Sequence, residues 1–128
     1  RRPMRRWRRR SVCGQPRFNP AKNTFRFGVE AGDKAEAVRG LRLAEDLFAK
    51  DALDLLILDE INSTIALGML DLPEFIKVLQ KKPVGLELVL TGRNAPQELL
   101  DKADLVTEMK LIKHYFYAGQ EAREGIEY

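Results

Sequence analysis

Four consecutive apolar residues, Leu55–Leu58, lead directly into the acidic pair Asp59–Glu60. An apolar run of this length is typical of a strand in a parallel sheet, which is buried on both faces. The carboxylates that follow it would then lie at the carboxyl edge of the sheet, where α/β proteins place their functional groups. We therefore predict an α/β fold in which Asp59 and Glu60 mark the edge that carries function.

Helices are predicted on both sides of this strand. Asp33–Glu36 and Asp71–Glu74 each have the spacing of a capping box, in which acidic side chains satisfy free backbone N–H groups at the start of a helix. The remaining expected elements are a short helix over Ile61–Leu70 that begins at Asn62 or Ser63, strands over Leu86–Thr91 and Leu105–Met109, and a helix that begins at Asn94. Strands that alternate with helices in this way predict a three-layer α/β domain with a mostly parallel sheet.

The stretch Leu55–Glu60 also has the pattern of a Walker B segment. In such a segment, carboxylates at a strand end hold Mg²⁺ directly or through water. The pattern is short, and a buried strand whose acidic end starts the next turn explains it equally well. Both interpretations place Asp59 and Glu60 at the end of the strand.

A second candidate is Thr91–Asn94, which follows one predicted strand and precedes a predicted helix. Gly92 lets the backbone turn closely, and Arg93 can pair with phosphate or carboxylate through two parallel N–H groups. The alternative is a turn glycine beside a solvated arginine. The position at a strand end favours the functional interpretation.

The sequence contains a single histidine, His114, and a single cysteine, Cys13, far from it. One histidine cannot build a histidine-rich metal site, so a structural or hydrogen-bonding role is the default expectation. Phe116, Tyr117 and Tyr128 would suit a flat apolar ligand, although core packing is the commoner use of such side chains.

An arginine-rich stretch opens the chain. Seven of the first ten residues are arginine, which leaves 15 basic against 19 acidic side chains in the remainder. Such a tail, with Trp7 in it, has the chemistry to bind nucleic acid or acidic membranes, but a disordered leader without a partner is the interpretation that we favour. We expect residues 1–24 to be tail and linker, and residues 25–128 to form a single α/β domain.

The cell compartment is indicated by two simple observations. No apolar run approaches the roughly 20 residues that cross a bilayer. A single cysteine allows no disulfide within the chain, which fits a reducing compartment. We therefore expect a cytoplasmic protein without a membrane span.

Five stretches together resemble the carboxyl half of the ATP:corrinoid adenosyltransferases, over about Asp33–Tyr128. They occur in one order with plausible gaps: 56–62, 90–96, 103–109, 113–114 and 125–128. The resemblance implies a nucleotide-binding fold of the P-loop type, truncated at its amino end, and a homodimer. It also implies transfer of the 5′-deoxyadenosyl group of ATP to the cobalt of a reduced corrinoid, with release of triphosphate.

The same resemblance implies roles for residues at the strand ends. Asp59 and Glu60 would hold the Mg²⁺ of Mg–ATP, with Glu60 the principal ligand. Glu60 and Arg93 would be the catalytic residues, and the ATP or corrinoid would be bound by Asp59, Thr91, Gly92, Asn94 and His114. Because Co(I) is itself a strong nucleophile, such a site has to position the 5′-carbon, neutralise the triphosphate and exclude water.

The chain departs from the family pattern in one serious respect, because it contains no G-x-x-x-x-G-K-[ST] loop to cradle phosphate. The nearest look-alike, Gly28–Lys34, has the wrong spacing and acidic residues where phosphate would sit. Ser63 also stands where the family usually has an aromatic residue. The missing loop argues against activity of this chain alone and fits a fragment, a truncated gene product or a divergent form.

Three hypotheses therefore stay open. The first is an adenosyltransferase whose missing part lies upstream or comes from a partner. The second is a non-catalytic remnant that binds corrinoid or forms a dimer. The third is a nucleic-acid binder that acts through the arginine-rich tail. The family resemblance favours the first.

Overall fold

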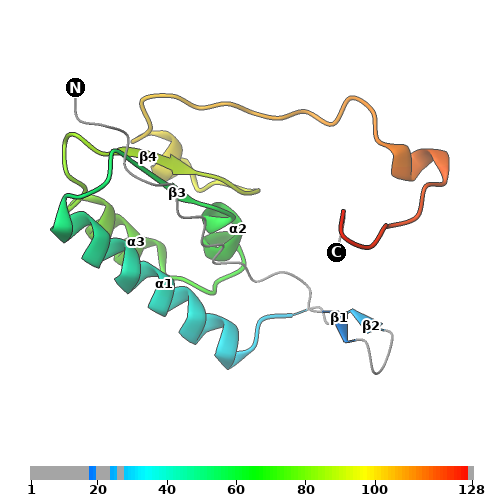
Figure 1. The fold of residues 1–128 in the computed structure, drawn as a ribbon, viewed down its shortest axis with the longest axis horizontal. Helices are drawn as coiled ribbons and strands as arrows, with labels where there is room; N and C mark the ends of the chain where they lie inside the picture. The colour runs from blue at the N-terminus through cyan, green and yellow to red at the C-terminus, as the bar shows by residue number, and fades with distance from the viewer. Residues whose placement is uncertain (1–17, 20–23, 26–27, 127–128) are drawn as a thin grey trace.

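The computed structural model describes residues 18–19, 24–25 and 28–126 (Figure 1). The arginine-rich stretch, Cys13 and Tyr128 lie outside them. The elements follow in the order β1 (Phe18–Asn19), β2 (Thr24–Phe25), α1 (Ala31–Lys50), β3 (Leu55–Leu58), α2 (Ile61–Ala66), α3 (Leu72–Leu79), β4 (Glu87–Leu90), α4 (Gln97–Leu100) and the 3-10 helix η1 (Tyr115–Ala118). Within the described residues, no helix is long and apolar enough to cross a membrane.

The two central strands, β3 and β4, form a small parallel sheet, so the chain is an α/β protein as expected. Leu56 pairs with Leu88, and Leu58 pairs with Leu90. These four leucines share one face because alternate residues of a strand point to the same side. The helices α1 and α3 lie side by side on one side of the sheet (Figure 1). β1 and β2 form a separate antiparallel pair.

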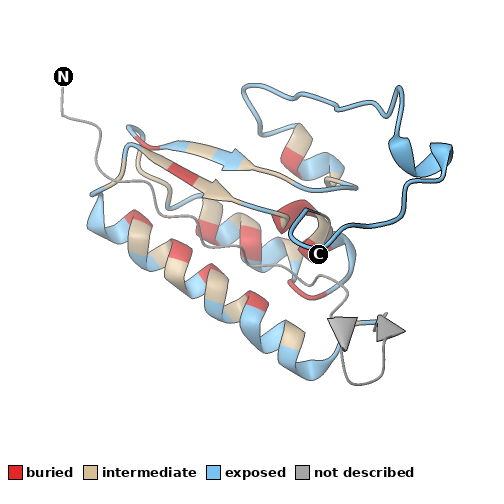
Figure 2. Ribbon diagram, turned by 45° about the vertical axis from the view of Figure 1, so that its right-hand side comes forward, coloured by how far each residue is buried: buried red, intermediate tan, exposed pale blue. Residues whose placement is uncertain are grey.

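The hydrophobic core fills the space between the two helices and the leucine face. α1 contributes a stripe that repeats every three or four residues, as one face of a helix does: Ala37, Leu41, Ala44 and Phe48. Figure 2 shows these buried positions along the side of α1 nearest the sheet. Phe75 of α3 is the most enclosed large side chain, with 1% of its surface exposed. This packing fixes the strands against the helices and thereby fixes where the strand ends lie.

The opposite face of the sheet is only partly covered, which corrects the expectation that Leu55–Leu58 is buried on both faces. Leu56 is the one buried residue of β3, and the other three are half-buried. Ile57 pairs with Val89 on this second face, and Val89 remains 42% exposed. Because α1 and α3 both pack on the leucine face, they cannot cover these two side chains.

Capping explains where the two longer helices begin. The cap at Asp71 is confirmed, since its side chain accepts a hydrogen bond from the N–H of Glu74 at 3.0 Å. The expected cap at Asp33 is wrong. Glu30 precedes the first turn of α1, and the Asp33 carboxylate reaches back to accept from the N–H of Glu30 at 3.0 Å. A capping box is therefore present, but it starts three residues earlier than predicted.

The two shorter helices also begin at residues other than those predicted. α2 starts after Glu60 rather than at Asn62 or Ser63, and α4 starts after Pro96 rather than Asn94. Glu60 has a left-handed backbone conformation, with φ 58° and ψ 19°, which a sequence pattern does not signal.

The carboxyl-terminal segment, residues 101–126, is exposed throughout (Figure 2). The strand predicted over Leu105–Met109 is absent, because no other described strand lies alongside to supply the backbone hydrogen bonds that a strand needs. Apolar side chains are left in water here, among them Leu105 at 85%, Met109 at 94% and Ile112 at 88% exposure. The only regular element of this segment is η1.

Candidate functional site

The carboxyl ends of β3 and β4 meet at a network of short polar contacts. The hydroxyl of Thr91, just after β4, donates to Oδ1 of Asp59 at 2.7 Å. The hydroxyl oxygen of Thr91 in turn accepts the backbone N–H of Glu60 at 2.9 Å. One hydroxyl therefore joins both acidic residues to the neighbouring strand end.

The unusual backbone of Glu60 is held by its surroundings. A left-handed conformation costs about 1–2 kcal/mol for a residue other than glycine. The N–H of Glu60 is bound to Thr91, while its carbonyl accepts from both the N–H and the hydroxyl of Thr64, at 3.0 and 2.9 Å. These contacts turn the chain sharply from β3 into α2 and leave Glu60 half-buried beside the exposed Asp59.

Ser63 adds a second link between the two strand ends. Its hydroxyl donates to Oε2 of Glu60 at 2.7 Å and accepts the backbone N–H of Arg93 at 2.9 Å. The other carboxylate oxygen of Glu60, Oε1, has no hydrogen-bond partner in the part of the chain that the structure describes. It is therefore available to a ligand.

Gly92 allows the two loops to approach this closely. Its φ is +120°, a backbone conformation that residues other than glycine rarely adopt. A Cβ atom there would lie 2.9 Å from the backbone nitrogen of Ser63 and 3.2 Å from Cβ of Asn62. The glycine predicted to allow a close turn is thus required by both the backbone conformation and the packing.

Arg93 and Asn94 complete the loop after β4, and both are exposed. The guanidinium of Arg93 forms no ion pair with any residue that the structure describes. Asn94 has φ 55°, a left-handed conformation that asparagine tolerates better than most residues. The loop therefore presents an exposed cation that no described residue pairs with, on a residue whose backbone N–H is bound to Ser63.

The site contains one buried polar atom without a partner. Asn62 is 7% exposed, and its Oδ1 accepts no hydrogen bond from the described residues. Its backbone N–H donates to the carbonyl of Thr91 at 3.1 Å, which ties α2 to the end of β4. The contacts of Asn62 and Ser63 were not predicted from the sequence, where both were candidate helix caps and Ser63 was also a departure from the family pattern.

His114 is not brought to this site. It lies at the start of η1, which stands apart from the ends of β3 and β4 (Figure 1). Its Nδ1 accepts the N–H of Phe116 at 3.1 Å, and its ring lies 4.5 Å from that of Tyr115. Arg123 stacks over the Tyr115 ring at 5.0 Å. His114 therefore caps the exposed helix η1 and packs against one of its aromatic rings.

Comparison with known proteins identifies the family. The family model described as ATP:corrinoid adenosyltransferase BtuR/CobO/CobP matches residues 17–128. The chain belongs to this family. A corrinoid adenosyltransferase of Sinorhizobium sp. is 40% identical over 106 residues, which cover 82% of this chain and 50% of that protein.

Two further relatives show the same partial coverage. The corrinoid adenosyltransferase of Pseudomonas aeruginosa is 38% identical over 96 residues, 75% of this chain and 47% of the relative. That of Escherichia coli is 35% identical over 85 residues, 66% of this chain and 43% of the relative. The chain thus spans about half the length of the curated adenosyltransferases that it matches.

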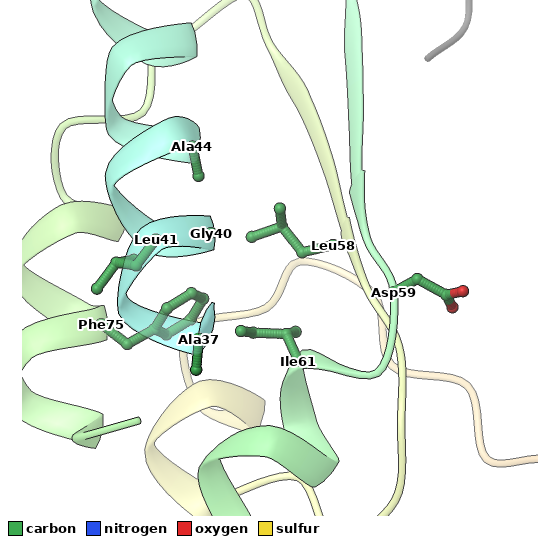
Figure 3. A pocket seen from close by; sticks show the side chains of 8 residues that line it. All are labelled: Ala37, Gly40, Leu41, Ala44, Leu58, Asp59, Ile61 and Phe75. Atoms are coloured by element: carbon green, nitrogen blue, oxygen red, sulfur yellow. The ribbon is translucent and has the colours of Figure 1, made fainter. Parts of the chain in front are cut away.

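A small apolar pocket in this adenosyltransferase-family chain does not serve the site. It is lined by α1, α3 and the β3–α2 turn, with a volume of about 20 Å³, which suffices for about one water molecule. Figure 3 shows the Asp59 carboxylate pointing away from the apolar side chains that line it. The pocket is a packing gap of the core, and the Asp59 carboxylate faces the other way.

The strand-end residues of this chain have the donor set that Mg²⁺ uses. Mg²⁺ in nucleotide sites is bound by one or two carboxylates, with waters and phosphate oxygens in the other positions. Asp59 and Glu60 provide two carboxylates, and the Thr91 hydroxyl contacts the carboxylate of Asp59 and the backbone N–H of Glu60. Groups of three or more acidic, histidine or cysteine ligands are absent from the described residues, so phosphate and water would have to complete the shell.

Proposed function

We propose that this chain contributes the strand-end part of an ATP:corrinoid adenosyltransferase site. In the proposed reaction, the electron pair of Co(I) attacks the 5′-carbon of ATP, a cobalt–carbon bond forms, and the carbon–oxygen bond breaks to release triphosphate. The observation that carries the proposal is the Thr91 hydroxyl, which joins Asp59 and Glu60 at the carboxyl ends of two parallel strands. Functional groups of α/β proteins gather at such an edge.

Glu60 and Asp59 are proposed to hold Mg²⁺, which when bound would neutralise charge on the triphosphate leaving group. Oε2 of Glu60 is bound by Ser63, so Oε1 is the oxygen left to bind the metal. Asp59 is exposed and keeps one carboxylate oxygen beyond its bond to Thr91. Glu60 is the better ligand of the two because its carboxylate and its backbone are both fixed before binding.

The loop after β4 is proposed to position the substrates. Arg93 would pair with the triphosphate or with an acidic group of the corrinoid, since it is exposed and its backbone is linked through Ser63 to the Glu60 carboxylate. Thr91, Gly92 and Asn94 would shape the loop around the nucleotide. His114 would help to bind the corrinoid only if the carboxyl-terminal segment folds toward the site in an assembly.

We further propose that residues 25–128 form one domain and that their sheet is part of a larger three-layer fold of the P-loop type. The partly exposed Ile57–Val89 face and the exposed carboxyl-terminal segment support this, because such apolar surfaces are normally covered. A homodimer would cover part of them. Sedimentation equilibrium of the full chain would show the dimer as a doubled mass.

The test is an anaerobic assay of residues 1–128 with reduced cob(I)alamin, Mg²⁺ and ATP. Loss of the Co(I) absorbance and growth of a light-sensitive cobalt–carbon product would be followed together. We expect Glu60→Ala to abolish Mg–ATP binding in calorimetry and any turnover with it. Glu87→Ala is the matched control, because Glu87 is exposed at the opposite, amino end of β4.

Calorimetry tests whether Glu60 holds the metal, and the anaerobic assay tests whether the chain turns over. Unchanged affinity for Mg–ATP in Glu60→Ala would show that Glu60 does not hold the metal. A folded chain that binds Mg–ATP without turnover would show that the rest of the adenosyltransferase length is needed for the chemistry.

A further inference from the structure

We infer that Ser63 is a positioning residue that holds the Glu60 carboxylate and the backbone of Arg93 in one fixed arrangement. The inference rests on the proposed function and adds to it a residue with no role in it so far. Ser63 lies in the third position of α2, half-buried, between the two strand ends that carry the proposed metal and phosphate groups.

Both side-chain hydrogen bonds of Ser63 go to these two groups. Its one hydroxyl proton goes to Oε2 of Glu60 at 2.7 Å, and its oxygen accepts the N–H of Arg93 at 2.9 Å. The two bonds run in one direction, from Arg93 through Ser63 to Glu60, so each polarises the other and strengthens it. A hydrogen bond to a charged carboxylate is also stronger than one between neutral groups.

Ser63 is itself held in place from several sides. The preceding residue, Asn62, donates its N–H to the carbonyl of Thr91 at 3.1 Å. A Cβ atom on Gly92 would come within 3.0 Å of the Ser63 hydroxyl, so the loop after β4 packs directly against it. A hydroxyl that is confined in this way gives Glu60 a fixed partner.

The consequence for the site is preorganisation. With Oε2 tied to Ser63, the Glu60 side chain keeps few other rotamers and presents Oε1 to a ligand. Less conformational entropy is then lost when Mg–ATP binds. Contacts of this kind behind a metal ligand typically change metal affinity by about 10–100-fold.

The test compares nucleotide binding with and without the metal, in the full chain. Calorimetry with Mg–ATP, and with ATP in EDTA, would be run on the wild type, Ser63→Ala, Ser63→Thr and the control Thr107→Val, which changes an exposed hydroxyl of the carboxyl-terminal segment. We expect Ser63→Ala to weaken Mg–ATP binding about tenfold and metal-free ATP binding less than twofold. Ser63→Thr keeps a hydroxyl and should recover most of the affinity.

Two results would overturn the inference: wild-type Mg–ATP affinity in Ser63→Ala, or equal weakening with and without Mg²⁺, which indicates a merely structural role. Circular dichroism would establish that each variant is folded. If the wild type binds no nucleotide, the proposed function fails, and Ser63 is judged by amide hydrogen exchange. The Arg93 amide should then exchange at least tenfold faster in Ser63→Ala than in the wild type, and an unchanged rate would refute the positioning role.

Discussion

Thr91 donates its hydroxyl proton to Asp59 across 2.7 Å, although 32 residues separate them in the sequence. The contact joins the carboxyl ends of the two parallel strands, and the Thr91 hydroxyl oxygen also accepts the N–H of Glu60. The shape of the acidic edge therefore depends on a residue of the other strand.

Replacing Thr91 by valine should remove both bonds while keeping the size of the side chain. Because the Glu60 N–H is then left without its partner, we expect the free energy of unfolding to fall by about 1–3 kcal/mol. Urea unfolding measures this loss. Thr91→Ser, which retains the hydroxyl, is the control and should lose less than half as much. Equal losses in the two variants would mean that the methyl group matters more than the hydrogen bonds.

Gly92→Ala should disrupt the site more than its size suggests. The added Cβ would meet the backbone nitrogen of Ser63 at 2.9 Å, and φ +120° is strained for alanine. We expect a loss of about 1–3 kcal/mol in unfolding free energy and a weaker affinity for Mg–ATP. Gly85→Ala is the matched control, because a Cβ there meets nothing within 4 Å. Similar effects of the two substitutions would contradict the close approach at Gly92.

The amides of residues 105–112 should exchange with solvent almost as fast as in an unstructured peptide when the chain is monomeric. They lie in the exposed carboxyl-terminal segment and take part in no helix or strand. The amides in the middle of α1 should be protected, since they combine helical hydrogen bonds with burial. Hydrogen exchange followed by mass spectrometry compares the two regions. Protection of residues 105–112 that increases with protein concentration would instead indicate that self-association covers them.

Features set by neighbouring residues could be predicted from the sequence. The strand Leu55–Leu58 follows from its apolar run, and the cap at Asp71 follows from the three-residue spacing to Glu74. The meeting of Asp59 and Glu60 with Thr91 followed from the rule that carboxyl ends of parallel strands share an edge. The local pattern and the parallel topology were together sufficient for this part of the site.

Features set by distant contacts could not be predicted. The left-handed Glu60 is stabilised by Thr91, 31 residues away, so its role as the start of α2 left no local signal. The strand expected at Leu105–Met109 has the right residues, but a strand also needs a neighbour with which to pair. The use of Ser63 as a link depends on how closely the Gly92 loop approaches, which only the tertiary structure determines.

The core that supports this edge should be sensitive to Phe75 in particular. Phe75 is 1% exposed and lies in α3 against the α1 stripe, beside the β3–α2 turn that leads into the site (Figure 3). Phe75→Ala should leave a cavity and cost about 3–5 kcal/mol, a large share of the stability of a domain this small. Val84→Ala is the control, because Val84 is fully exposed at 101% and should change the stability by less than about 0.5 kcal/mol. Thermal unfolding measures the stability of both variants. A Phe75→Ala chain as stable as the wild type would mean that this core does not hold the two strands in place.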